Sequence, residues 1–358
     1  MQTGIVGLPQ VGKTTLFKIL TKVHLDAKAT QAAMHVGVAR VPEPRVDKLA
    51  ALYRPKKVTH ATVQYVDVGG LQKDRTRDAA VLAPLREVDA LAHVLRVFEN
   101  PAVPHSAGSI DPLRDATNLD LELMLNDLEQ ITRRLERVEK DLKKKKDLAL
   151  EAERVLLLRC KAAIEKETPL RELEFSVEEM KMLTSFMFLS QRPMLYVLNL
   201  GDSEAAEIET AVERHKLGAL CSKPNTGVVP ICGRLEAELV DLEEAEASEL
   251  VASYGFKESG LDRLIHATYR LLGLTSFFTA GDPEVRAWTI RRGTTAVKAA
   301  GVIHSDIERG FIRAEVVRCD DLLDAGSMGA ARERGKMRLE GKDYVVQEGD
   351  VILFRHSG

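Results

Sequence analysis

The sequence predicts an α/β protein in which a parallel-sheet domain carries a long helical insert and is followed by a small, separate α+β domain. Three observations predict this arrangement. Short apolar runs alternate with helical stretches over most of the chain, a helical repeat interrupts them after residue 118, and strand-like runs separated by glycine-containing turns follow residue 276. Alternating strands and helices are typical of a parallel sheet with helices packed on its faces.

The strands of the predicted sheet are short runs of β-branched and other apolar residues. Several of them are almost continuously apolar, which indicates strands that are buried on both faces. We expect these strands at residues 4–7, 60–68, 91–98, 193–200 and 227–232.

The helical insert is predicted between Asn118 and Thr168, and it contains two sets of apolar residues at spacings of three and four. The run from Lys143 to Lys146 separates the two sets, which indicates two antiparallel helices joined by a charged tip. One long helix lying against the core is the alternative. The first set is Leu121, Met124, Leu128, Ile131, Leu135, Val138 and Leu142, and the second is Leu148, Ala152, Val155, Leu158 and Ala162.

The last part of the chain has a different residue pattern, with strand-like runs separated by glycine-containing turns. This pattern predicts a small mixed α+β domain with its boundary near residues 276–281. Strand-like runs occur at residues 285–290, 311–317 and 344–355, and residues 294–307 are expected to be partly helical. A chain of 358 residues is too long for one compact core, so a division into domains is expected.

The composition excludes several classes of protein. With 45% hydrophobic and 29% charged residues and a net charge of −3, the chain is typical of a globular protein without a general attraction to polyanions. Its four cysteines lack metal-ligand spacing, so neither a zinc site nor a disulfide framework is expected. No apolar run approaches the ~20 residues that span a bilayer, and no signal segment is present, so we expect a cytoplasmic protein with no membrane partner.

A phosphate-binding loop is predicted at the N-terminus. Gly7-x-x-x-x-Gly12-Lys13-Thr14 has the P-loop spacing and lies between an apolar strand and a helical stretch. The glycines allow backbone N–H groups to point at phosphate oxygens. Lys13 is expected to reach the β- and γ-phosphates, and the Thr14 hydroxyl to ligate Mg²⁺. The predicted phosphate-binding residues are Gly7, Leu8, Pro9, Gln10, Val11, Gly12, Lys13, Thr14 and Thr15.

A second motif on the phosphate side is Asp67-Val-Gly-Gly70, at the end of a predicted strand. Asp67 is expected in or near the Mg²⁺ shell, with the Gly70 N–H facing the γ-phosphate. Leu71 follows where Ras-like GTPases carry the glutamine that orients the attacking water. Leucine neither donates nor accepts a hydrogen bond, so we expect slow intrinsic hydrolysis.

The base-recognition element is predicted at Asn199-Leu200-Gly201-Asp202, where a GTPase would carry Asn-Lys-x-Asp. Asp202 suits guanine, because a carboxylate can accept from the two donors that guanine offers. The missing lysine weakens the case for GTP without settling it. Cys232, at the end of a later predicted strand, is the further candidate on the base side.

These motifs and several longer stretches resemble the YchF/Obg-like ATPase family, a group of Obg-related P-loop NTPases. The final stretches resemble the TGS domain of that family, a ubiquitin-like β-grasp module. The resemblance implies a Mg²⁺-dependent ATPase, with the NTPase domain at residues 1–117 and 169–275, the coiled-coil insert at 118–168 and the TGS domain at 276–358. The stretches that carry it are GIVGLPQVGKTTLF, VDVGGL, HVLRVFEN, PMLYVLNL, FFTAGDPEVRAWTI, AAGVIHSDIERGFIRAE and GKMRLEGKDYVVQEGDV.

The chain departs from the family pattern at three places. The base motif of the family ends in glutamate rather than Asp202, so ATP is favoured and GTP is not excluded. Gln10 replaces an asparagine that helps hold K⁺ in potassium-activated relatives, which puts a K⁺ requirement in doubt. In the switch region, residues 29–45, Gln31 stands where a threonine is expected and Thr30 is adjacent, so the second Mg²⁺ ligand is not assigned.

The resemblance also implies a catalytic candidate and a partner. Family members carry a histidine at the position of His105, in the loop FENPAVPHSAG, and we expect it to position the attacking water. A surface histidine without a role is the alternative.

Ribosome association in the family implies the ribosome or ribosomal RNA as a partner. The contacts would be the TGS domain and the tip residues Lys143, Lys144, Lys145 and Lys146, and no DNA is expected. The alternative for the tip is a run of lysines that is exposed to solvent and has no binding role. The first interpretation is therefore a slow ATP-driven switch. A true GTPase and a nucleotide-bound binding module with little turnover are the alternatives.

Overall fold

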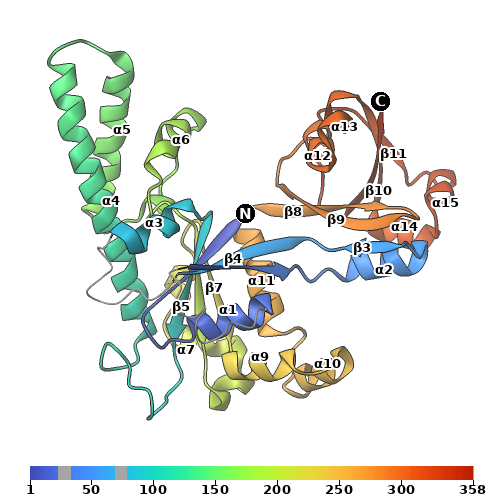
Figure 1. The fold of residues 1–358 in the computed structure, drawn as a ribbon, viewed down its shortest axis with the longest axis horizontal. Helices are drawn as coiled ribbons and strands as arrows, with labels where there is room; N and C mark the ends of the chain where they lie inside the picture. Colours follow the sequence, from blue (N-terminus) through green and yellow to red (C-terminus); the bar gives the residue numbers. More distant parts are fainter. Residues whose placement is uncertain (23–33, 69–78, 358) are drawn as a thin grey trace. The chain divides into compact units, whose positions relative to one another are not determined.

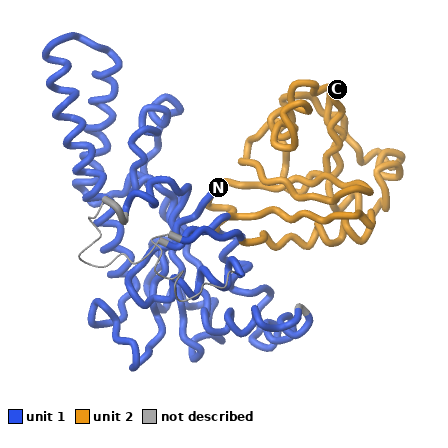
Figure 2. The backbone as a smooth tube through the Cα atoms, in the orientation of Figure 1, with its two compact units in different colours: residues 1–38, 64–267 blue, residues 39–63, 268–358 orange. Residues whose placement is uncertain are grey.

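The computed structural model describes residues 1–22, 34–68 and 79–357. Their contacts divide the chain into two compact units, shown in Figure 2. Unit 1 comprises Met1–Val38 and Gln64–Ala267, and unit 2 comprises Ala39–Val63 and Thr268–Gly358.

The centre of unit 1 is a six-stranded sheet with the strand order β2-β4-β1-β5-β6-β7 (Figure 1). From β4 to β7 all neighbouring strands are parallel, as the alternation of strands and helices predicts. Every residue of β5 and β6 is buried, which explains the continuous apolar runs in the sequence. The strands are β1 (Gln2–Val6), β2 (Met34–Arg40), β4 (Thr62–Val68), β5 (Ala90–Arg96), β6 (Met194–Asn199) and β7 (Thr226–Ile231).

Helices of unit 1 cover this sheet. One core packs side chains of α3 and the start of α4 against β5 and β6, with the segment around residues 208–220 completing it. Helices α1 and α9 contact one another. Besides α4 and α5, the helices of unit 1 include α1 (Lys13–Thr21), α3 (Ala79–Glu87), α6 (Val177–Leu183), α7 (Ala211–Arg214), α8 (Gly218–Cys221), α9 (Gly233–Val240), α10 (Glu244–Ser253) and α11 (Gly260–Leu271), with 3-10 turns η2 (Leu170–Glu172), η3 (Thr184–Phe186) and η4 (Asp202–Thr210).

The helical insert is an antiparallel hairpin of α4 (Pro112–Leu142) and α5 (Leu148–Ile164), so the single-helix alternative is wrong. Helix α4 begins earlier than Asn118, because the Asp111 side chain accepts a hydrogen bond from the Arg114 N–H and a proline occupies the first turn. Asp147 caps the start of α5 in the same way. Between the helices lies the exposed lysine tip, as the sequence predicts.

Unit 2 contains a mixed sheet with the strand order β11-β10-β12-β8-β9-β3. Strand β12 pairs parallel with β8, and α12 packs small side chains against the sheet, an arrangement consistent with a β-grasp module. The strands are β3 (Lys57–Thr59), β8 (Leu274–Ala280), β9 (Glu284–Arg291), β10 (Phe311–Arg318), β11 (Arg338–Glu340) and β12 (Asp350–His356). The helices are α2 (Pro44–Tyr53), α12 (Ala296–Ile303), α13 (Ser305–Arg309), α14 (Cys319–Ala325) and α15 (Met328–Glu333).

Three features of unit 2 differ from the sequence expectation. Strand β8 begins at Leu274, because its first residues pack in the core. Of the expected strand at 344–355, only the part from Asp350 onward forms β12. Residues 39–63, which the resemblance placed in the first domain, belong to this unit because β3 pairs with β9 and Arg45 forms an ion pair with Glu348.

Candidate functional site

The backbone of the loop between β1 and α1 requires glycine at two positions. Gly7 and Gly12 have φ values of 144° and 101°, in the region that favours glycine. A Cβ on Gly7 would lie 2.6 Å from the Val94 carbonyl oxygen, and one on Gly12 would lie 2.5 Å from the Asn199 side chain. Helix α1 begins at Lys13 and no described side chain caps it. Its first N–H groups are therefore available to an anion.

Lys13 is folded back onto the loop that precedes it. Its ammonium donates hydrogen bonds to the carbonyl oxygens of Gly7, at 2.9 Å, and Leu8, at 2.7 Å. The residue is 8% exposed. Burial lowers the pKa of Lys13 to about 8, and the negative charge of Asp67 opposes part of this shift. The loop thus holds a partly desolvated cation at the place where a phosphate group is expected.

Thr14 and Asp67 provide a pair of oxygen ligands beside this cation. The Thr14 hydroxyl donates to Asp67 Oδ2 at 3.0 Å, and Asp67 is 4% exposed. The second carboxylate oxygen, Oδ1, is buried and has no hydrogen-bond partner among the described residues. Since hard divalent cations prefer oxygen ligands, these two residues fit Mg²⁺. No group of three or more candidate metal ligands occurs in the described part of the chain.

Asn199 ties the loop to the turn between β7 and α9. Its Nδ2 donates to the Val11 carbonyl at 3.0 Å, and its Oδ1 accepts from the Gly233 N–H at 3.0 Å. Both ends of the amide are therefore used within the protein. Leu200 stands at the lysine position of a GTPase motif and is 2% exposed, so it supplies no polar group to a base.

The Asp202 carboxylate is already engaged on both oxygens. Oδ1 accepts from the Cys232 thiol at 3.6 Å, and Oδ2 lies 3.0 Å from a guanidinium nitrogen of Arg234. Burial raises the pKa of the Cys232 thiol, which therefore stays protonated at neutral pH. Sequence reasoning missed Gly233 and Arg234. The signal that could have found them is their place directly after β7, at the sheet edge that carries the other motifs.

The His105 side chain is largely enclosed, whereas the alternative in the sequence analysis was a surface histidine, and its catalytic role stays a prediction. Its side chain is 5% exposed, and Nε2 lies 3.2 Å from Asp115 Oδ2. Its Nδ1 accepts a hydrogen bond from the Ala107 N–H at 3.1 Å. Asp115 lies in the first turn of α4, so its carboxylate lies beside the ring. Burial lowers the pKa of His105, and the Asp115 carboxylate opposes that shift.

Several predicted site residues lie outside the described part of the chain. They are Gly70, Leu71, Thr30 and Gln31, together with the rest of the segments at 23–33 and 69–78. At the opposite end of unit 1, the lysine tip is exposed, and Lys144 forms an ion pair with Asp141 at 3.0 Å.

Comparison with known proteins gives matches along the whole chain. Residues 2–151 match a family model described as "50S ribosome-binding GTPase", and residues 274–357 match the YchF-GTPase C-terminal model, described as a "Protein of unknown function". The "Ribosome-binding ATPase YchF" of Bacillus subtilis (strain 168) is 41% identical over 100% of this chain and 99% of its own length. The protein of the same name from Haemophilus influenzae is 39% identical over 99% of this chain and 98% of its own.

A solved structure agrees with these matches. The Schizosaccharomyces pombe YchF GTPase superimposes with a TM-score of 0.87 and 30% identity, and the match covers 99% of this chain and 97% of that one. Within the described residues, no helix combines the length and the apolar character needed to cross a membrane.

Proposed function

Because the chain belongs to the YchF family of P-loop NTPases, we propose that it is a slow, Mg²⁺-dependent ATPase that acts as a nucleotide-controlled switch on ribosomes in the cytoplasm. The observation that carries this proposal is the phosphate cradle, in which Lys13 lies buried beside the Thr14–Asp67 pair. The names of the relatives, which describe ribosome-binding ATPases, support the substrate and the partner.

The chain's own groups suffice to hold a triphosphate. The phosphate oxygens would replace the carbonyls of Gly7 and Leu8 as acceptors for the Lys13 ammonium, and the N–H groups at the start of α1 would donate to the same anion. When bound, Mg²⁺ would supply positive charge that offsets the negative charge of the phosphates. Thr14 and Asp67 are the residues that would hold it.

The state of the base site favours ATP over GTP. A GTPase places a lysine and a carboxylate at guanine, whereas Leu200 stands at the lysine position here and is buried. Asp202 contacts Cys232 and the exposed Arg234, and this exposed contact leaves it able to accept further hydrogen bonds. Leu200 and Cys232 present no charged group of their own. Gln10, in place of the family asparagine, supports turnover that does not depend on K⁺.

The attacking water lacks its usual partner, because Leu71 replaces the glutamine of Ras-like enzymes. We assign its positioning to His105, which would have to exchange its contact with Asp115 for one with water. An imidazole with a lowered pKa is neutral at pH 7, and because Nδ1 accepts from the Ala107 N–H, the ring proton lies on Nε2, which would donate to the water.

Equilibrium binding of labelled ATP and GTP, followed by phosphate release with and without ribosomes, tests the proposal. We expect tighter binding of ATP, slow basal release and co-sedimentation of the protein with ribosomes. Tight preference for GTP would overturn the ATPase assignment. Nucleotide binding without any phosphate release under either condition would favour the binding-module alternative.

The affinity for ATP should fall as the pH rises above about 8. Free Lys13 has a pKa of about 8, and triphosphate charges must raise it, so binding takes up a proton wherever the free amine is neutral. The expected loss approaches about tenfold per pH unit above that pKa. Titrations with labelled ATP at several pH values measure it, with circular dichroism as the control for folding. An affinity independent of pH up to about pH 10 would contradict the burial of an ionisable Lys13 at the phosphate site.

Replacing His105 with alanine should lower turnover by on the order of 100-fold while leaving ATP affinity nearly unchanged, because water positioning acts on the chemical step. Single-turnover phosphate release measures this loss. The matched control is His356→Ala, because His356 is an exposed histidine of unit 2, and its loss should leave turnover unchanged. Equal turnover in the alanine variant and the wild type would remove His105 from the mechanism.

A further inference from the structure

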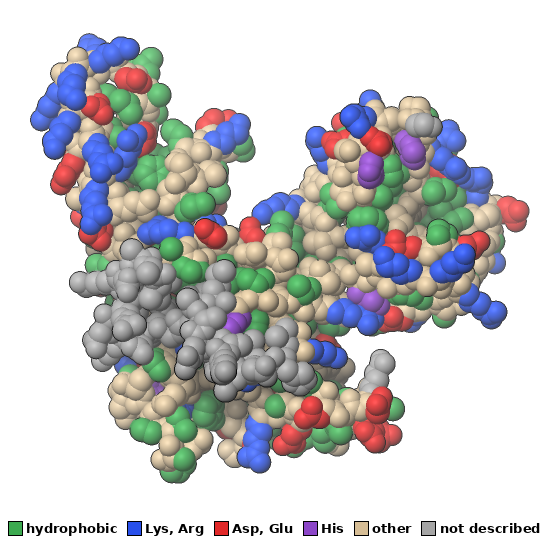
Figure 3. Space-filling view, viewed as in Figure 1, with side chains coloured by type: hydrophobic (Ala, Val, Ile, Leu, Met, Phe, Trp, Pro, Cys, Tyr) green, Lys and Arg blue, Asp and Glu red, His purple; other side chains and the backbone are tan. Residues whose placement is uncertain are grey.

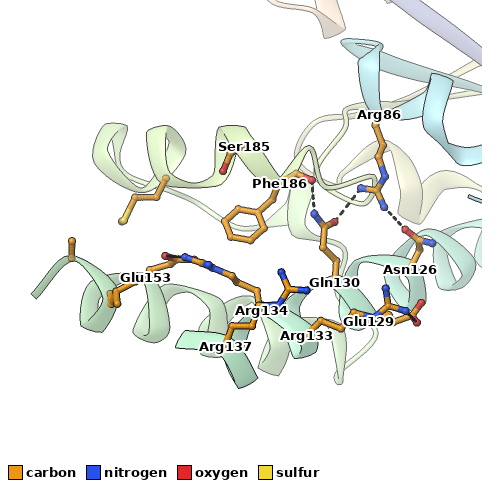
Figure 4. A pocket seen from close by; sticks show the side chains of 13 residues that line it. Arg86, Asn126, Glu129, Gln130, Arg133, Arg134, Arg137, Glu153, Ser185 and Phe186 are labelled. Atoms are coloured by element: carbon orange, nitrogen blue, oxygen red, sulfur yellow. Dashed lines mark hydrogen bonds and ion pairs between the residues drawn. The ribbon is translucent and has the colours of Figure 1, made fainter. Parts of the chain in front are cut away.

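Arg96 is a buried arginine at the carboxyl end of β5. It is the last residue of that strand, is 2% exposed and pairs in register with Asn199 of β6. Many other basic side chains reach the surface, as Figure 3 shows along the hairpin. Figure 4 shows Arg86 in the lining of a pocket beside the hairpin, where it donates to the side chains of Gln130 and Asn126. Arg96 instead contacts the backbone.

The Arg96 guanidinium holds two carbonyl groups of the loop that follows β5. Its Nε donates to the Phe98 carbonyl oxygen at 3.0 Å, and its Nη2 donates to the Val103 carbonyl oxygen at 2.8 Å. The guanidinium carbon also lies over the Phe98 ring, 4.5 Å from its centroid. We call these contacts the Arg96 clamp. Because one rigid, planar group joins both ends of the segment 98–103, it fixes the shape of that segment.

The Arg96 clamp lowers the stability of the fold. The guanidinium forms no ion pair with a described carboxylate, and its Nη1 is buried without a hydrogen-bond partner among the described residues. A buried charge without a counter-charge and an unpaired N–H both carry a desolvation penalty. Side chains that break the rules of burial in this way are expected at functional sites.

A stiff link joins the clamp to His105. Val103 precedes Pro104, and His105 follows it directly. The proline ring fixes its own φ and restricts Val103 to extended conformations. Beyond the ring, the Ala107 N–H donates to His105 Nδ1, and the Gly108 N–H donates to the His105 carbonyl at 2.9 Å. The position of the Val103 carbonyl therefore limits where the imidazole can lie.

The charge of Arg96 also acts on the imidazole. Burial is the largest cause of the lowered pKa of His105, and the Asp115 carboxylate opposes it. The positive charges of Arg114 and Arg96 lower the pKa further. Arg96 thus favours the neutral ring that the proposed positioning of water requires.

We propose that Arg96 is a positioning residue for ATP hydrolysis, which holds the segment 98–103 in the shape that directs His105 at the attacking water. This inference rests on the proposed role of His105 and deepens it. Arg96 acts through the histidine and not on the phosphates.

Arg96→Met should slow phosphate release at saturating ATP by about 10- to 100-fold, because a displacement of about 1 Å in a catalytic group can cost about 100-fold. The affinity for ATP should stay within about threefold of the wild type, since the loss falls on the chemical step. Single-turnover phosphate release and titration with labelled ATP measure the two effects separately.

The matched control is Arg192→Met. Arg192 is half-buried and also donates to a backbone carbonyl, that of Arg86, but it lies next to the start of β6, at the opposite edge of the sheet. It should leave turnover within about twofold of the wild type. Circular dichroism of both variants checks that they fold.

A double variant separates positioning from a general loss of stability. Arg96→Met/His105→Ala should release phosphate within about twofold of the rate of His105→Ala alone, because the side chain that Arg96 positions is already absent. Arg96→Lys should recover only part of the turnover lost in Arg96→Met, since an ammonium keeps the charge but lacks the planar fork that reaches both carbonyls.

Pro104→Gly tests the link between the clamp and His105 without removing a buried side chain, so it decides the question even where Arg96→Met fails to fold. It should lower turnover at saturating ATP and leave the affinity for ATP nearly unchanged, because glycine frees the chain between Val103 and His105. Pro101→Gly is its control, since Pro101 is also exposed but lies between the two clamped carbonyls. It should keep turnover within about twofold of the wild type.

Wild-type turnover in Arg96→Met or in Pro104→Gly would overturn the proposal. Full recovery in Arg96→Lys would overturn it too, since charge alone would then suffice, and so would losses that multiply in the double variant. Wild-type turnover in His105→Ala would contradict the proposed role of the histidine itself. A loss in His105→Ala beside wild-type turnover in Arg96→Met would contradict only the role of Arg96, which separates the two failures.

Discussion

Lys13→Ala should reduce ATP turnover by about 1000-fold or more. Charged donors aimed at transferring phosphates typically contribute about 10²–10³ to the rate, and this lysine is expected to contribute to binding as well. The structure gives a physical reason to expect a large loss of turnover. The ammonium is buried and held at 2.9 Å and 2.7 Å from two loop carbonyls, so its charge is only weakly screened by solvent. Single-turnover phosphate release at saturating ATP measures the effect.

Lys18→Ala is the matched control, because this lysine lies in the last turn of the same helix. It should leave turnover within about twofold of the wild type, since surface substitutions away from the site have small effects. ATP hydrolysis that persists in Lys13→Ala at the wild-type rate would place the chemistry elsewhere in the chain. Circular dichroism of both variants separates lost chemistry from lost folding.

Much of unit 1 could be predicted from the sequence, because its signals are local. The loop spacing from Gly7 to Thr14 specifies a strand, a turn and a helix within a few residues, and the structure contains all three. The hairpin was predictable for the same reason, because the apolar spacing and the charged tip both lie within one continuous stretch of the sequence.

Long-range contacts account for what sequence reasoning missed. Nothing near Lys57 indicates that β3 will pair with β9, because that pairing depends on residues more than half the chain away. The contact of His105 with Asp115 spans only ten residues, but it depends on where α4 begins. Arg234 became a candidate only when the structure placed it beside Asp202. Motifs specify local geometry, whereas the partners of a polar side chain depend on the fold.

A buried ion pair joins the hairpin to the central sheet. Arg171, which is 2% exposed, donates to Asp120 of α4 at 2.5 Å. The hydroxyl of Tyr196, on β6, donates to the same carboxylate oxygen at 2.6 Å. Burial raises the pKa of Tyr196, with the Asp120 charge adding to the shift, so the phenol stays protonated and keeps donating. Three elements therefore meet at one carboxylate.

Asp120→Ala should lower the free energy of unfolding by about 3–5 kcal/mol, because it leaves the Arg171 guanidinium buried without a counter-charge. Urea unfolding followed by circular dichroism measures the loss. Breaking an exposed pair is the control: Lys144→Ala, opposite Asp141, should cost less than about 1 kcal/mol.

The double variant Asp120→Ala/Arg171→Met should recover part of the loss, because it removes the stranded charge together with its partner. This recovery distinguishes an electrostatic cause from the cavity that alanine alone would leave. A loss in Asp120→Ala no larger than that in the exposed pair would show that water reaches Arg171, and the joint between hairpin and sheet would not depend on this ion pair. If adding Arg171→Met lowers the free energy of unfolding further than Asp120→Ala alone, the stability would instead come from packing around α4.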